Sequence, residues 1–178
     1  MLALVAIPWR FFCHMHNTHC RRIVVSLGSN IGPRDAHIAN ALAFLRTLHE
    51  GEMKKFRVST ISETAPIGCA PETPVFLNAV AAFDSSLPAH ALLDALLAYE
   101  TTQGRPATRE KNTPRTIDLD LLFCGTEHHN DERLVLPHPR IEERPFLQAM
   151  LAEIDEASPS SHFDATDAVD AVDSVDIN

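Results

Sequence analysis

Two aspartates, Asp118 and Asp120, stand one residue apart in an otherwise apolar stretch. Side chains alternate along an extended strand, so both carboxylates project from one face, about 6.6 to 6.8 Å apart. The opposite face is expected to pack into the core through Ile117, Leu119, Leu121 and Phe123. Hard oxygen ligands favour Mg²⁺, and two ions about 3.5 to 4 Å apart would fit between the carboxylates and bridge phosphate oxygens. The alternative is an exposed strand face with two solvated acids.

A basic loop precedes the aspartates. Its four cations and single acid are Arg105, Arg109, Lys111, Arg115 and Glu110. Guanidinium forks beside Mg²⁺-binding carboxylates are what a polyphosphate site requires. A solvated basic loop is the alternative, and the neighbouring aspartates make it the less favoured one. The sequence has no Walker-type or Gly-x-Gly-x-x-Gly motif, so any bound ATP would depend on the loop and the metals.

Glu100 occupies an unusual place in a helical pattern. It follows Leu93 and Leu97 on what we expect to be an apolar helix face. The acid either ends the buried stripe or lines a polar pocket.

Hydrophobic periodicity predicts the order strand, helix, strand, strand, helix, strand. The expected ranges are 21–30, 32–50, 54–64, 75–85, 86–104 and 115–125, followed by a hairpin at 126–137 and a helix within 138–154. We expect Ser86 to cap the second helix and Gly104 to end it. The order predicts an α+β fold of the ferredoxin-like class, an antiparallel sheet with packed helices in a three-layer α/β/α sandwich.

The charge of the chain is unevenly distributed. The formal net charge is −9 over 178 residues, but residues 153–178 hold eight acids and no Lys or Arg. The other 152 residues hold 16 acids against 15 bases, which argues against nucleic acid as a partner. We expect one domain over residues 21–155 and a disordered acidic tail over residues 156–178.

The N-terminal 20 residues are expected to be a disordered leader. Its possible metal ligands, crowded into eight residues, are Cys13, His14, His16, His19 and Cys20. Zinc sites normally space ligand pairs across a folded unit, which favours the leader interpretation. The scattered cysteines indicate reduced thiols in a cytoplasmic protein, and the apolar runs are too short for a membrane span. We expect a monomer without a membrane partner.

Five segments together resemble one enzyme family. They are SLGSN at 26–30, ETAPIG at 63–68, FLNAV at 76–80, residues 104–123, and ERLVLPHPRIEERPF at 132–146. In this order and spacing they closely resemble the 6-hydroxymethyl-7,8-dihydropterin pyrophosphokinases of folate biosynthesis over roughly residues 22–154. The resemblance implies diphosphoryl transfer from ATP to the pterin hydroxymethyl group, with release of AMP.

The resemblance also implies three groups of site residues. The catalytic group, in which the two aspartates ligate two Mg²⁺ and the arginines contact phosphate, is Arg105, Arg115, Asp118 and Asp120. The pterin group is Asn30, Thr64, Ala65, Ile67, Phe76, Asn78 and Phe146, with the two Phe rings enclosing the pterin. The ATP group is Glu100, Arg105, Arg115, Arg133, Leu134, His138 and Arg144.

Strand alternation independently supports the pterin group, because Phe76 and Asn78 share a face and offer a stacking ring beside an amide. Two positions depart from the family pattern. Some members carry Trp where this chain has Asn112, and Arg where it has Ala107. The alternatives to a pterin pyrophosphokinase are a non-catalytic pterin- or nucleotide-binding relative, and another Mg²⁺-dependent nuclease or nucleotidyl-transferase.

Overall fold

The computed structural model describes residues 20–66, 68, 72–105 and 113–156. The helices are α1 (Arg34–Leu48), α2 (Ala89–Thr102) and α3 (Pro145–Glu156), with a 3-10 turn, η2, at Met53–Lys55. The strands are β1 (Arg21–Ser29), β2 (Arg57–Val58), β3 (Ser62–Thr64), β4 (Phe76–Ser85), β5 (Asp118–Cys124), β6 (His129–Asn130) and β7 (Val135–Leu136).

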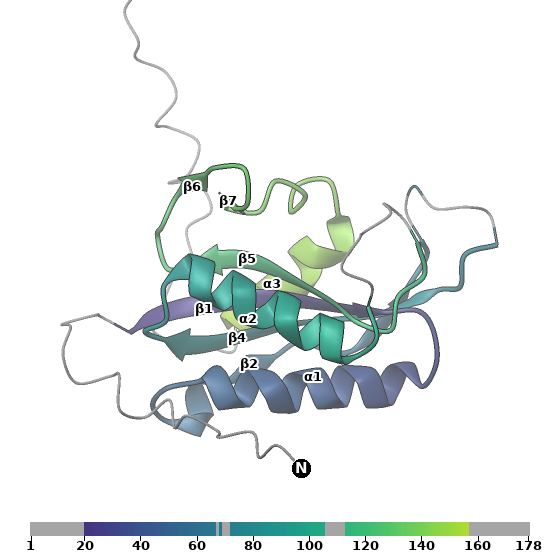
Figure 1. The fold of residues 1–178 in the computed structure, drawn as a ribbon, viewed down its shortest axis with the longest axis horizontal. Coiled ribbons are helices and arrows are strands. Elements are labelled where there is room, and N and C mark those ends of the chain that lie inside the picture. Colours follow the sequence, from purple (N-terminus) through teal and green to yellow (C-terminus); the bar gives the residue numbers. More distant parts are fainter. Residues whose placement is uncertain (1–19, 67, 69–71, 106–112, 157–178) are drawn as a thin grey trace, which may run out of the picture.

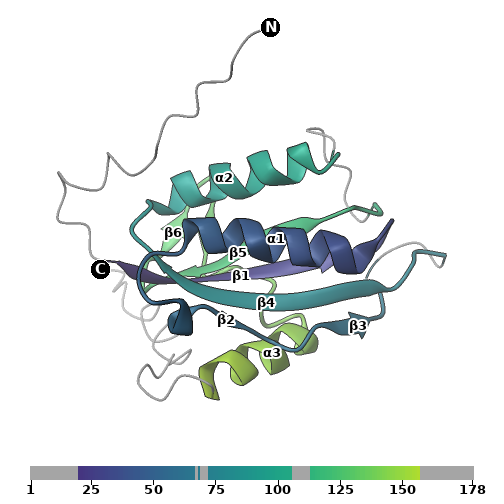
Figure 2. The same ribbon diagram turned by 90° about the horizontal axis from the view of Figure 1, so that it is seen from below.

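An antiparallel sheet forms the middle layer of the molecule. Its strand order is β2-β4-β1-β5, and β3 pairs with β4 next to β2. Helices α1 and α2 cover one face and α3 covers the other (Figure 1, Figure 2). The α+β prediction with an antiparallel sheet between helices is therefore confirmed. The expected strand at 54–64 is divided into β2 and β3, both paired with the long strand β4.

Each face of the sheet has its own apolar core. On the side of α1 and α2, the core includes Leu77, Ala79, Ala81 and Phe83 of β4. On the side of α3, Val80 and Ala82 pack with Leu147, Met150 and Ile154. The side chains of β4 thus alternate between the two faces, which confirms the predicted shared face of Phe76 and Asn78 and leaves both on the α3 side at the end of the strand.

The predicted facing of Phe123 is wrong. A register shift against β1 pairs Val24 with Phe123 but Val25 with Leu121, so Leu122 is an extra residue. Such a β-bulge interrupts the alternation of side chains. Phe123 consequently joins Leu122 in the core under α3, whereas the alternation of Asp118 and Asp120 precedes the bulge and is preserved.

The predicted cap of the second helix is also wrong. Helix α2 begins at Ala89 after Pro88 and has no side-chain cap. Ser86 instead donates its hydroxyl to Glu50 Oε1 at 2.7 Å, and the same oxygen accepts the Ser86 backbone N–H at 2.9 Å. The serine therefore joins the loop after α1 to the start of α2.

The end of α2 agrees with the prediction. Gly104 adopts a positive φ of 86° after the helix. Its N–H donates to the Thr101 carbonyl, and the Arg105 N–H donates to the Glu100 carbonyl, both at 3.1 Å. These two bonds form a Schellman motif, which reverses the chain and returns Arg105 to the side of Glu100.

Two further expectations can be compared with the structure. Cys20 and Cys124 are free thiols, while Cys13, Cys69, the leader before residue 20 and the tail after residue 156 lie outside the described residues. None of the helices in the described part of the chain is long and apolar enough to cross a membrane.

Candidate active site

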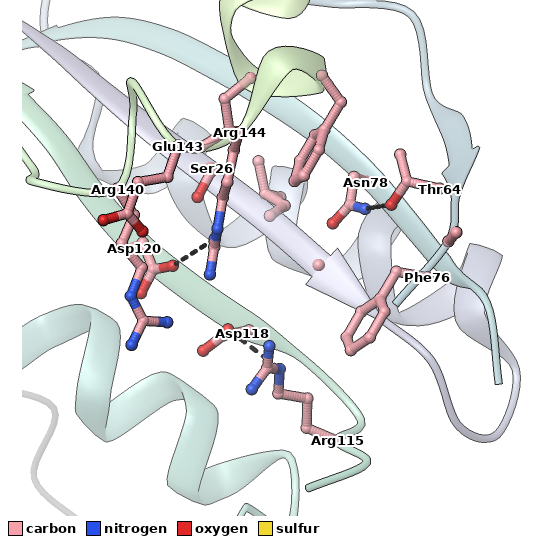
Figure 3. A pocket seen from close by; sticks show the side chains of 15 residues that line it. Ser26, Thr64, Phe76, Asn78, Arg115, Asp118, Asp120, Arg140, Glu143 and Arg144 are labelled. Carbon is pink, nitrogen blue, oxygen red and sulfur yellow. Dashed lines mark hydrogen bonds and ion pairs between the residues drawn. The ribbon is translucent and has the colours of Figure 1, made fainter. Parts of the chain in front are cut away.

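A cleft of about 280 Å³ opens on the α3 face of the sheet (Figure 3). Strands β1, β4 and β5 form its floor, and the segment that leads into α3 forms a wall. Its lining residues are Ser26, Leu27, Gly28, Thr64, Ala65, Phe76, Asn78, Arg115, Asp118, Asp120, Arg140, Glu143, Arg144, Phe146 and Leu147. Nine of these were predicted as site residues, and they come from the pterin, catalytic and ATP groups.

Gly28 lies in the middle of this floor, between Asn78 of β4 and Asp118 of β5. In the sheet register it pairs with Asn78 on one side and Asp118 on the other. A Cβ atom at position 28 would lie 2.8 Å from Asn78 Oδ1, which is closer than van der Waals contact allows. The glycine therefore leaves space for the Asn78 amide and keeps the floor open toward the carboxylates.

The pterin group supplies an aromatic ring and a fixed amide. Phe76 is 7% exposed, and its ring has the Arg115 guanidinium carbon 5.1 Å from its centroid. The Asn78 amide nitrogen donates to Thr64 Oγ1 at 2.6 Å. This bond fixes the orientation of the Asn78 amide. Its nitrogen points to Thr64, so its oxygen points toward Gly28.

Asp118 and Asp120 both face the cleft, and guanidinium groups surround them. Arg105 forms an ion pair with Asp118 Oδ1, and Arg115 Nε lies 3.0 Å from Asp118 Oδ2. Arg144 Nη1 lies 3.7 Å from Asp120 Oδ2. Burial, and then the charge of Asp118, raise the pKa of Asp120, against the opposing effects of His138, Arg144 and Arg115.

The donor chemistry at this point fits magnesium. Two carboxylates face the same cleft, and the negative charge of Asp118 disfavours the ionised form of Asp120. A hard divalent cation would offset this repulsion, and oxygen ligands are what Mg²⁺ prefers.

Glu100 is a buried anchor for the same site. Its side chain is 1% exposed, and it continues the buried line of Leu92 and Leu96 rather than the predicted line of Leu93 and Leu97. Glu100 Oε1 accepts from Arg105 Nη1 at 2.8 Å and from the Leu119 backbone N–H at 2.6 Å. The acid thus joins α2, Arg105 and strand β5.

Asn30 has a supporting position next to the cleft. Its side-chain oxygen accepts the Arg115 N–H at 2.7 Å, and its own N–H donates to the Arg115 carbonyl at 3.2 Å. These bonds fix the backbone of Arg115. Asn30 is buried and is not among the residues that line the cleft, so its predicted contact with the pterin stays a prediction.

The predicted ATP group is divided in the structure. Arg144 lines the cleft, and His138 is close enough to Asp120 to interact electrostatically, while burial lowers the pKa of His138. Arg133 forms an ion pair with Asp94 on α2, and Leu134 belongs to the core under α1 and α2. Neither of these two lines the cleft, and Ile67 of the pterin group lies outside the described residues.

Sequence reasoning missed six lining residues: Ser26, Leu27, Gly28, Arg140, Glu143 and Leu147. Gly28 lies in the SLGSN segment at 26–30, from which only Asn30 was assigned to the site. Arg140 and Glu143 lie between the His138-Pro139 pair and the last helix. The concentration of charged residues before that apolar helix was the one sequence feature that could have indicated them.

This arrangement is typical of an enzyme that transfers phosphoryl groups, because paired acids and arginines meet in one cleft beside a stacking site. A family model described as 7,8-dihydro-6-hydroxymethylpterin-pyrophosphokinase matches residues 24–156. The chain belongs to this family. The predicted family is therefore confirmed, and with it the enzyme class, the pyrophosphokinases of folate synthesis.

Individual relatives agree with this assignment. The 2-amino-4-hydroxy-6-hydroxymethyldihydropteridine pyrophosphokinase of Bacillus subtilis is 40% identical over 131 residues, which cover 73% of this chain and 75% of that protein. The protein of the same name from Synechocystis is 38% identical, with coverage of 76% and 67%. A folate synthesis bifunctional protein of Arabidopsis thaliana is 34% identical over 80% of this chain, and the match spans only 29% of that longer protein.

Proposed function

We propose that this chain transfers the diphosphoryl group of ATP to the hydroxymethyl oxygen of 6-hydroxymethyl-7,8-dihydropterin, giving the pterin diphosphate and AMP. One observation carries the proposal: Asn78 and Asp118 flank Gly28 in adjacent strands. A site for a flat polar heterocycle and a site for a polyphosphate therefore share one floor, on two strands separated only by β1, which corresponds to roughly 9–10 Å.

The pterin lies against Phe76, with Phe146 as the second ring of the cleft. Stacking suits a flat heterocycle, and a fixed amide recognises its polar edge through one donor and one acceptor. Asn78 and Thr64 supply these groups, with the backbone at Ala65 and, in the part of the chain not described, Ile67. Arg115 contacts both the Phe76 ring and Asp118, so it lies where the pterin and phosphate sites meet.

Asp118 and Asp120 are the residues that would hold two Mg²⁺, which neutralise the triphosphate and polarise its phosphorus–oxygen bonds when bound. Arg105 and Arg115, now paired with Asp118, turn their guanidinium groups to the transferring oxygens. The hydroxymethyl oxygen attacks the β-phosphorus in line and loses its proton to solvent, while the bond from that phosphorus to the α-phosphate oxygen breaks and AMP leaves. Positioning and charge stabilisation account for the rate.

The nucleotide is proposed to bind on the Arg144 side of the cleft near His138, with Glu100 acting through Arg105. The assignment of Arg133 and Leu134 to its base rests on the family resemblance alone, because neither residue lines the cleft. The protein works as a cytoplasmic monomer on these two small substrates, without nucleic acid or membrane partners.

The products test the function. The full chain is incubated with ATP, Mg²⁺ and the reduced hydroxymethylpterin, and the products are identified by ³¹P NMR. We expect AMP and pterin diphosphate in equal amounts. Formation of ADP would mean single phosphoryl transfer, release of pyrophosphate would mean nucleotidyl transfer, and absence of pterin-dependent AMP would leave only a binding role; each of these contradicts the proposal.

Gly28→Ala is expected to weaken pterin binding by about 10-fold or more, because displacing the Asn78 amide leaves a polar group of the ligand unpaired, at a cost of about 1–3 kcal/mol. Calorimetric titration with the pterin measures the loss. Asn78→Ala provides the control, since adding Gly28→Ala to it removes no further amide contact. An equal loss from Gly28→Ala in both backgrounds would show that the glycine does not act through Asn78.

Gly104→Ala is expected to destabilise the protein by about 1–2 kcal/mol, because an L side chain is strained at positive φ. Gly51→Ala is the matched control, since Gly51 also has a positive φ and open space for a Cβ. Urea unfolding should show similar losses for both, but only Gly104→Ala should lower the turnover number, through the displaced Arg105. Equal turnover in the two variants would contradict the role of the helix end in placing Arg105.

A further inference from the structure

A cluster of two histidines and one aspartate lies where the β6–β7 hairpin meets the beginning of α2 (Figure 1). His90 is in the first turn of α2, His129 is in β6, and Asp131 follows β6 in the turn. One ligand atom from each residue lies within 4.8 Å of the other two. None of the three was singled out from the sequence, and none lines the cleft.

Asp131 is held in place by its own turn. Its Oδ1 atom accepts the backbone N–H groups of Arg133 at 2.9 Å and Leu134 at 3.0 Å. The other oxygen, Oδ2, lies 2.9 Å from His90 Nε2. The backbone hydrogen bond from Arg133 is the main cause that lowers the pKa of Asp131. One oxygen anchors the residue and the other remains directed at His90.

His129 has an outer partner of the kind that orients metal-binding imidazoles. Glu127 Oε2 lies 3.0 Å from His129 Nε2, and Glu127 is itself paired with Arg21. A ligating histidine usually gives its second ring nitrogen to a carboxylate, which fixes the tautomer and the ring orientation. The rings of His129 and His90 meet edge to face with their centroids 5.2 Å apart.

We propose that His90, His129 and Asp131 bind a divalent transition-metal ion of the zinc class, which joins the β6–β7 hairpin to α2. Two imidazoles and one carboxylate form a borderline donor set that suits Zn²⁺, with water as the fourth ligand. This set differs from the carboxylate pair in the cleft, whose oxygens suit Mg²⁺. The proposal is independent of the proposed function.

The cluster needs only a small adjustment to coordinate an ion. Tetrahedral zinc with bonds of 2.0–2.1 Å to nitrogen places its ligand atoms roughly 3.4 Å apart. The His90 and Asp131 atoms lie 2.9 Å apart and must separate slightly, while the other ligand atoms, all within 4.8 Å of one another, must approach by no more than about 1.4 Å. The His90 side chain is 41% exposed, so rotation about its side-chain bonds meets little packing.

The binding test uses the full chain with Zn²⁺ as the probe, measured by competition with a chromophoric chelator. Wild type is expected to bind one equivalent more than His129→Ala and His90→Ala. His128→Ala is the matched control, because His128 is the exposed neighbour on the same hairpin. All variants keep the leader and the cleft carboxylates, so zinc bound elsewhere cancels in the comparison. Equal stoichiometry in wild type and His129→Ala, or an equivalent loss in His128→Ala, would overturn the proposal.

Thermal unfolding gives a second readout. Zn²⁺ is expected to raise the midpoint of wild type and His128→Ala but not that of His129→Ala, because an ion that binds only the folded state stabilises it. Asp131→Asn serves if an alanine variant does not fold, since its amide oxygen can still accept from the turn while the charged ligand is lost. A zinc-dependent shift in Asp131→Asn as large as that of wild type would also contradict the site.

Discussion

Asp118→Asn and Asp120→Asn are each expected to lower turnover by about 10³-fold or more, which is the scale found when charge stabilisation is removed from a phosphoryl-transfer site. Both substitutions keep the shape of the side chain and remove a negative charge that faces the cleft. Each variant then lacks one of the two carboxylates proposed to hold Mg²⁺ for the phosphates, whereas the stacking surface of Phe76 and the amide of Asn78 are unchanged. Pterin affinity should therefore remain close to that of wild type.

Initial rates of pterin-dependent AMP formation measure the first effect, and calorimetric titration with the pterin measures the second. Asp35→Asn is a suitable control, because Asp35 is an exposed acid in the first turn of α1. Near-normal turnover in either cleft variant would remove the basis for a metal site on β5. A loss of turnover that only follows a loss of pterin binding would show that the carboxylates act on the other substrate.

Glu100→Leu is expected to lower the free energy of unfolding by about 2–4 kcal/mol, because it leaves the half-buried Arg105 charge with Asp118 as its remaining carboxylate partner. It also leaves the Leu119 N–H without its acceptor. Glu100→Gln keeps an acceptor for Leu119 but loses the charge opposite Arg105, so its cost should be smaller, about 1.5–3 kcal/mol.

Urea unfolding at neutral pH gives both values, with Glu142→Gln as a control at an exposed acid before α3, where about 0.5 kcal/mol or less is expected. If Glu100→Leu were as stable as wild type, the contacts from Glu100 to Arg105 and Leu119 would not be holding β5 against α2. The loss in the free energy of unfolding should also be larger for Glu100→Leu than for Glu100→Gln. Equal losses would assign the whole effect to the loss of charge.

Strand alternation was sufficient to predict the faces of β4 and the shared face of Asp118 and Asp120. It failed at Phe123, because the bulge at Leu122 depends on pairing with β1 and no glycine or proline marks it. The cap at Ser86 failed for a similar reason, since the long-range bonds to Glu50 replace the local one.

The phase of α2 could not be chosen from periodicity alone. Leu92, Leu93, Leu96 and Leu97 provide two adjacent apolar lines, and either could have been the buried one. Only packing against β5 selects the line that ends in Glu100, and this choice turns an apparently marginal acid into the most deeply buried charge of the described chain.

The site was predictable where its residues come from one strand or one quoted segment. Gly28 was missed because its role is the absence of a Cβ opposite Asn78, a property of the register between β1 and β4. Arg140 and Glu143 reach the cleft through the position of the segment before α3, which no local pattern specifies. Arg133 and Leu134 were assigned to the nucleotide by resemblance, and in the structure they contact α2 and the core.

The most direct test of the central claim is a crystal structure of the full chain with the pterin, a non-hydrolysable ATP analogue and Mn²⁺ in place of Mg²⁺. Anomalous scattering then locates the ions independently of the remaining density. We predict two ions on Asp118 and Asp120, and the pterin between Phe76 and Phe146 with its edge on Asn78. Ions bound away from both aspartates, or a pterin bound outside the cleft, would contradict the account.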